Sequence, residues 1–184
     1  MNLHRHRHFF IDVEAFGPPG QGNPFALACV PFTLRGDIGE GKQWNFQGPG
    51  IKHGIWESAE RSTLRWLLSQ PEAVRAQVNG DMPFELAYAQ FRDMIQAEPG
   101  PVMLWSDDWS DFAWIDAYVR LWTNENVREL GCSADSTGLV RLAKMREPDA
   151  VWPSFEGTQH VALDDARNGA RELCHAIALL NLKP

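Results

Sequence analysis

The chain begins with two runs of strand-forming residues, and this start limits the folds that are open to it. Residues 8–15 and 24–32 are rich in aromatic, β-branched and other apolar side chains, which is typical of β-strands. Glycine and proline crowd the short segment between the two runs, so we expect a turn and antiparallel pairing. Residues 33–54 are rich in glycine and are expected to form a loop or a ragged hairpin.

Helical and strand patterns alternate in the rest of the chain. Short apolar strands are expected at 102–105 and 131–137, and amphipathic helices at 62–69, 72–78, 83–96, 112–122, 138–145 and 163–180. Strands followed by alternating helices and strands predict an α/β or α+β domain around one mixed sheet.

Size, charge and cysteine usage exclude several classes of protein. With 184 residues, 44% of them hydrophobic, we expect a single domain over residues 1–184, with residues 1–7 frayed. A net charge of −7 argues against a broad basic face for duplex DNA. Three scattered cysteines support neither a disulfide framework nor a zinc ribbon, which favours a cytoplasmic location. No apolar run reaches the roughly 20 residues of a membrane span, and we expect no membrane association.

The first candidate site lies on the first strand, in the sequence Phe-Ile-Asp-Val-Glu-Ala at 10–15. Side chains alternate along a strand, so Asp12 and Glu14 point the same way, roughly 6–7 Å apart. Two carboxylates on an apolar strand repel each other, and a hard divalent cation between them would remove that repulsion. The simpler alternative is an edge strand whose acidic residues face water.

The second candidate site lies at the start of the last helix. His160 and Asp165 are five residues apart and would not share a helix face. They can reach a common site if His160 lies in the loop and Asp165 in the first helical turn. In the alternative interpretation, Asp164 and Asp165 only favour the helix N-terminus through its dipole.

The third candidate is the acidic, aromatic segment 104–115, between an expected strand and an expected helix. Active-site groups often lie at such connections in α/β folds. Asp107, Asp108 and Asp111 are the candidates, and any of them could instead cap the helix.

Together the three features resemble the DEDDh branch of the DnaQ-like 3′–5′ exonucleases. The Asp12-x-Glu14 pair, an aspartate before a mid-chain helix, and the segment from His160 to Ala166 match the motifs of that branch. The segment at 63–70 (TLRWLLSQ), with Ala73 and Arg75, is similar to one in small bacterial and phage exoribonucleases, and the segment 135–137 is similar to another. The match spans most of the chain, from Phe10 to Leu173.

The resemblance implies a ribonuclease H-like three-layer fold with a mixed sheet of about five strands. It further implies two Mg²⁺ or Mn²⁺ ions held by Asp12, Glu14, Asp111 and Asp165, with His160 as general base. Asp111 is chosen because Asp111-x3-Ile115 matches the family's spacing, but the flanking sequence departs from the family, so Asp107 or Asp108 remain alternatives.

The resemblance also predicts the substrate and the assembly. Single-stranded RNA or short oligonucleotides are expected, with single-stranded DNA as the alternative and a non-catalytic binding module as another. Val13, Ala15 and Phe16 would face the terminal nucleotide, and Phe16 would either stack on the base or pack within its own loop. Related small exoribonucleases favour a homodimer.

Overall fold

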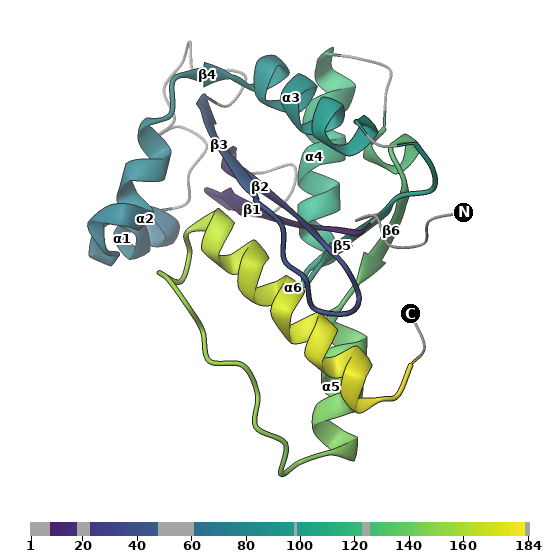
Figure 1. The fold of residues 1–184 in the computed structure, drawn as a ribbon. Helices are drawn as coiled ribbons and strands as arrows, with labels where there is room; N and C mark the ends of the chain where they lie inside the picture. Colours follow the sequence, from purple (N-terminus) through teal and green to yellow (C-terminus); the bar gives the residue numbers. More distant parts are fainter. Residues whose placement is uncertain (1–7, 18–22, 48–60, 98, 123–125, 183–184) are drawn as a thin grey trace.

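The computed structural model describes residues 8–17, 23–47, 61–97, 99–122 and 126–182. Its strands and helices follow the order expected from the sequence (Figure 1). The elements, in chain order, are β1 (His8–Ala15), β2 (Pro24–Phe32), β3 (Lys42–Gln47), α1 (Arg61–Ser69), α2 (Glu72–Ala76), the 3₁₀ turn η3 (Gln77–Asn79), β4 (Met82–Pro83), α3 (Phe84–Gln96), β5 (Met103–Ser106), α4 (Trp109–Trp122), the 3₁₀ turn η4 (Val127–Glu129), β6 (Cys132–Asp135), α5 (Thr137–Arg146) and α6 (Ala162–Leu179).

The strands form one mixed sheet of six strands in the order β4-β3-β2-β1-β5-β6. The strand β1 pairs antiparallel with β2 and parallel with β5, so it lies in the middle of the sheet. The expectation of about five strands was one short, because β4 has only two residues and pairs with β3 at the edge.

Most expected elements are confirmed with shifts of one or two residues, while the glycine-rich segment needs a correction. The strands at 8–15 and 24–32 have the predicted bounds. Within 33–54, residues 42–47 form the strand β3, antiparallel to β2, so the hairpin alternative holds there. Trp44 and Phe46 alternate with polar residues and bury on one face, which is the strand signal behind this element. Residues 48–54, and the N-terminal residues 1–7 expected to be frayed, lie outside the described part of the chain.

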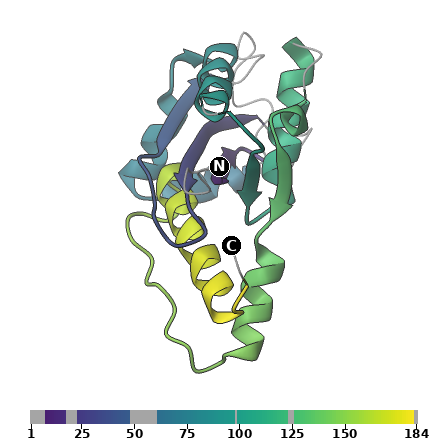
Figure 2. The same ribbon diagram turned by 45° about the vertical axis from the view of Figure 1, so that its right-hand side comes forward.

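Helices cover both faces of the sheet, which gives the three layers implied by the resemblance (Figure 2). On one face, α3 and α4 pack against apolar side chains such as Phe9 and Ile11 of β1. On the other face, α6 packs against Phe10 of the same strand, together with side chains of α1 and α2. The alternation of buried residues along β1 therefore divides the core into two clusters.

Small residues bring α6 close to the sheet. Ala26 and Ala28 of β2 are fully buried, as are the three alanines of α6 that share their cluster, Ala162, Ala166 and Ala170. Gly169 of α6 lies over the ring of Phe10, where a Cβ atom would come within 2.4 Å of that ring. The side-chain volume in this layer therefore sets how closely the helix approaches β1.

Among the helices of the described residues, none combines the length and apolarity needed to cross a bilayer.

Candidate active site

The acidic pair of β1 faces α6. Asp12 and Glu14 lie on the strand face that also carries Phe10, while Ile11, Val13 and Ala15 between and beside them pack on the other face. Their partners across the pair with β2 are Ala28 and Ala26, whose small side chains leave room above the strand. The prediction that the two carboxylates share one face is confirmed.

The start of α6 brings the second predicted pair to the same place. One carboxylate oxygen each from Glu14 and Asp165 and one ring nitrogen of His160 lie within 4.8 Å of one another. The backbone N–H of His160 donates to Oδ2 of Asp165 at 2.7 Å, and His160 has a left-handed φ of 67°. A histidine in the loop and an aspartate in the first helical turn thus reach one site, as the sequence predicted.

The mid-chain acidic segment supplies two carboxylates. Oxygens of Asp12, Asp107 and Asp111 also lie within 4.8 Å of one another. Asp111 is only 5% exposed; its Oδ1 accepts the N–H of Val13 at 3.3 Å, and its Oδ2 accepts the hydroxyl of Ser106. Asp107 therefore accompanies Asp111 in the site, where the sequence had offered them as alternatives.

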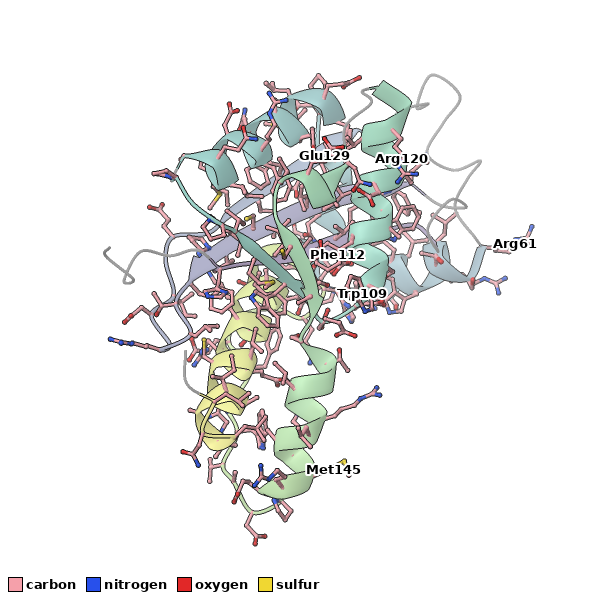
Figure 3. The ribbon with its side chains drawn as sticks, turned by 90° about the vertical axis from the view of Figure 1, so that its right-hand side faces the viewer. Arg61, Trp109, Phe112, Arg120, Glu129 and Met145 are labelled. Carbon is pink, nitrogen blue, oxygen red and sulfur yellow. The ribbon has the colours of Figure 1, made fainter. Side chains whose placement is uncertain are left out.

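Asp108 has a different role from its two neighbours. Its Oδ1 accepts the N–H of Ser110 at 2.9 Å, so it caps the first turn of α4. Figure 3 shows this turn through Trp109 and Phe112, while Arg120 marks the other end of the helix. The capping interpretation is thus confirmed for one of the three aspartates.

Burial and mutual repulsion make these carboxyl groups weak acids in the metal-free protein. Burial, followed by the charges of Asp111 and Glu14, raises the pKa of Asp12 well above its usual range. Burial, with Asp165 and Asp107 nearby, raises the pKa of Glu14 to about 8. Burial raises the pKa of Asp165 to about 6, opposed by the hydrogen bond from the N–H of His160.

The donor set fits divalent metal ions. Oδ2 of Asp12 is one of the few buried side-chain oxygens without a hydrogen-bond partner among the described residues. Asp12 supplies an oxygen to the Asp107–Asp111 group and shares its strand face with Glu14 of the other group, so it connects the two groups. Hard cations such as Mg²⁺ and Mn²⁺ prefer carboxylate oxygens, and a cation would remove the repulsion that raises the pKa values.

The residues predicted to face the terminal nucleotide lie beside this cluster. The N–H of Val13 is held by Asp111, and the N–H of Phe16 donates to the carbonyl of Asn23 at 3.0 Å. Ala15 is half-buried at the end of β1, paired with Pro24. The ring of Phe16 is 2% exposed and packs on Phe25 at 4.7 Å between centroids, so it belongs to the core in this structure. Of the two alternatives for Phe16, the structure has the packed one.

A cavity of about 350 Å³ opens from the site between α5 and α6. Asp107 and Asp165 of the carboxylate cluster line the cavity where it meets the site. Arg141 and Lys144 of α5 also line it. Nζ of Lys144 also lies 3.7 Å from Oε2 of Glu172. The sequence analysis did not single out these two cations, although their spacing of three residues places them on one helix face.

Comparisons with known proteins agree with this architecture. Pop2p of S. pombe, in a form with Mg²⁺ and Mn²⁺ bound, superposes with a TM-score of 0.62 at 12% identity, over 94% of this chain and 83% of that one. Exonuclease I of E. coli, in complex with a dA16 oligonucleotide, gives a TM-score of 0.60 at 13% identity over 96% of this chain. Exonuclease I of Methylocaldum szegediense gives 0.60 at 15% identity over 95% of this chain. This chain spans about two-fifths of the exonuclease I chains, 41% and 40% respectively.

At these identities the structural neighbours establish the fold, which is that of the ribonuclease H-like exonucleases. A comparison with curated protein sequences finds no significant match. The model of one protein family, described as the 3′–5′ exoribonuclease Rv2179c-like domain, matches residues 7–177, nearly the whole chain. The chain therefore belongs to the family of 3′–5′ exoribonuclease Rv2179c-like domains, and with it to the 3′–5′ exonucleases.

Proposed function

We propose that this protein is a metal-dependent 3′–5′ exonuclease that shortens single-stranded RNA or short oligonucleotides by a two-metal mechanism. The observation that carries the proposal is the meeting of two groups of ligand atoms, from Glu14, His160 and Asp165 and from Asp12, Asp107 and Asp111. These groups come from three separate parts of the chain, and the fold brings them to one end of β1.

The carboxylates would hold the metal ions. Glu14 and Asp165 would hold one Mg²⁺ or Mn²⁺ ion, and Asp107 and Asp111 a second. Asp12 lies in the second group and on the strand face of Glu14, so it would contribute to both ions. When bound, such ions lower the pKa of a coordinated water and stabilise charge on the phosphate and the leaving oxygen.

His160 would accept the proton of the attacking water at a ring nitrogen. Its imidazole is exposed beside Glu14 and Asp165, so a water at the carboxylates is within its reach. Histidine is the side chain that most often serves as a general base in enzymes.

The cavity between α5 and α6 would take the strand on the 5′ side of the bond that is cut. Arg141 and Lys144 offer positive charge to backbone phosphates, although the chain as a whole carries −7. Sequence-independent binding of single strands typically relies on such backbone contacts.

The homodimer, the cytoplasmic location and the single domain over residues 1–184 stay predictions.

A gel time course on a 5′-labelled single-stranded RNA, with a DNA copy alongside, tests the proposal. The reactions contain Mg²⁺, Mn²⁺ or EDTA, and a parallel series uses His160→Ala. We expect a ladder that shortens from the 3′ end only with metal, with loss of most of the rate in the variant. Faster cutting of the DNA copy would favour the exodeoxyribonuclease alternative, and folded protein that cuts neither strand with either metal would leave a binding module.

A further inference from the structure

A buried glutamine lies beneath the start of α6. The side chain of Gln77, in η3, is 2% exposed, although a primary amide in a core must find partners for its donors and acceptor. The turn η3 packs against β3 and β2, at the same end of the sheet as the acidic cluster. No charge or motif in the sequence marks this residue, and the exonuclease motifs do not include it.

Gln77 makes hydrogen bonds to two backbone groups at the start of α6. Its Nε2 donates to the carbonyl oxygen of His160 at 2.6 Å, and its Oε1 accepts the N–H of Ala162, the first residue of α6, at 3.1 Å. Its Oε1 also accepts a hydrogen bond from Nε2 of Gln43 at 2.9 Å. Oε1 of Gln43 in turn accepts a hydrogen bond from the N–H of Leu163 at 2.9 Å. Two glutamines therefore satisfy the first N–H groups of a helix whose N-cap residue makes no side-chain hydrogen bond.

The backbone conformation of His160 depends on being held from both sides. A φ of 67° is uncommon for a residue with a side chain, and it persists where the surroundings determine it. The N–H of His160 is held by Asp165, and its carbonyl oxygen is held by Gln77. The ring then lies edge-on to Trp66 of α1, with 4.8 Å between the ring centroids.

We propose that Gln77 is a positioning residue for His160, and that it fixes the imidazole relative to the metal-ligating start of α6. The proposal rests on the proposed role of His160 as general base. One amide group ties the loop that carries this histidine to the helix that carries Asp165, so both move as a unit. Without it, the loop can leave the left-handed conformation and carry the ring away from Glu14.

The test is a double-mutant cycle in a steady-state assay on a short RNA with Mg²⁺. It compares the wild type, Gln77→Met, His160→Ala and the double variant. Methionine conserves the volume of glutamine and removes its hydrogen bonds. Gln90→Met is the matched control, because Oε1 of Gln90 accepts a hydrogen bond from Nε1 of Trp44 at 3.0 Å on the opposite face of the sheet.

We expect Gln77→Met to lower kcat about 10- to 100-fold, as the loss of groups that orient catalytic side chains does, with KM changed less than about twofold. The double variant should be no slower than His160→Ala, and Gln90→Met should keep the wild-type kcat. A wild-type kcat in folded Gln77→Met, or losses that multiply in the double variant, would overturn the proposal. If Gln77→Met does not fold, Gln77→Asn, which is one methylene too short to bridge both partners, takes its place in the same cycle.

Amide exchange in the metal-free protein separates this proposal from the proposed function. In Gln77→Met the N–H of Ala162 should lose protection and the NMR signals of the His160 ring should shift, whether or not the protein cuts RNA. Unchanged exchange and unchanged signals would overturn the positioning role. A wild-type rate in His160→Ala would instead refute the general base, and the catalytic part of this proposal with it.

Discussion

The backbone N–H of Val13 donates a hydrogen bond to Oδ1 of Asp111, a residue 98 positions further along the chain. Val13 stands between the two acidic residues of β1, so this bond ties the first turn of α4 to the acidic end of the strand. Ser106 holds the other oxygen of the same carboxylate. Asp111 is therefore oriented before any metal ion arrives.

This orientation predicts unequal roles for the two mid-chain aspartates. Asp111→Asn keeps an oxygen for Val13 and removes the charge, and we expect kcat to fall about 100-fold or more, since even supporting groups of metal sites cost 10- to 100-fold. Asp107 is exposed, and Asp107→Asn should cost about tenfold at most. Steady-state rates and Mg²⁺ titrations of both variants check this. A larger loss in Asp107→Asn would make that residue the main ligand.

The raised pKa values predict that the metal-free protein loses stability as the pH rises. The pKa of Glu14 is about 8 in the folded protein and about 4.5 when the chain is unfolded, so between these values the folded state binds more protons. Stability contributed by the protonated form is complete below about pH 4.5 and is lost as the pH rises through 8. Asp165, with a pKa of about 6, adds a loss between about pH 4 and 6.

Thermal unfolding in EDTA and in Mg²⁺ measures this effect. In EDTA the melting temperature should be lower at pH 8 than at pH 6, by about 2–4 °C for each 1 kcal/mol lost in a chain of this size. The increase caused by Mg²⁺ should be larger at pH 8, where the carboxylates are free of protons. Glu14→Gln is the control, and its metal-free melting temperature should depend less on pH. A metal-free protein that is more stable at pH 8 would contradict the cause given for the shifts.

Two helical glycines should respond to alanine with opposite signs. Gly138→Ala, in α5, adds a methyl group to open space and should stabilise the protein by up to about 1 kcal/mol through helix propensity. Gly169→Ala should destabilise it by about 1–3 kcal/mol, because the new methyl group would meet the ring of Phe10. Denaturant unfolding of both variants decides the matter, and a stabilising Gly169→Ala would mean that α6 can move off the sheet freely.

The cations of the cavity should act on binding rather than on chemistry. We expect Arg141→Gln to raise KM for single-stranded RNA several-fold with little change in kcat, and to weaken the salt dependence of binding. Arg146→Gln, in the last turn of the same helix and outside the cavity, is the matched control. Equal effects of the two variants would indicate that the strand does not pass through this cavity.

The sequence predicted those parts of the molecule whose physics is local. The strands at 8–15 and 24–32 and the helix at 163–180 carry strong periodic patterns, and the structure has all three. Local geometry also predicted that Asp12 and Glu14 share a strand face and that His160 and Asp165 meet at the start of a helix.

The remaining features depend on contacts between distant parts of the chain. Which of the three mid-chain aspartates is buried follows from the hydrogen bonds of Asp111 with Val13 and Ser106, which no local pattern contains. The packing of Phe16 depends on Phe25 of the neighbouring strand. Gln77 reads as an ordinary helical glutamine, and two of its partners, the carbonyl oxygen of His160 and the N–H of Ala162, lie more than eighty residues away. The strand β3 was not predicted separately, because the glycine-rich sequence before it indicated a loop, although its own residues alternate between buried and polar.

The alanines between α6 and the sheet have a consequence for how this enzyme can change. Because Ala26, Ala28 and Ala166 set the depth at which α6 lies, they also set how far Asp165 stands from the acidic strand. A single added methylene in this layer would move Asp165 away from Asp12 and Glu14 without altering any of these carboxylates. Random mutagenesis should therefore find substitutions that change the metal preference at buried positions of this layer, which contact neither the substrate nor the ions.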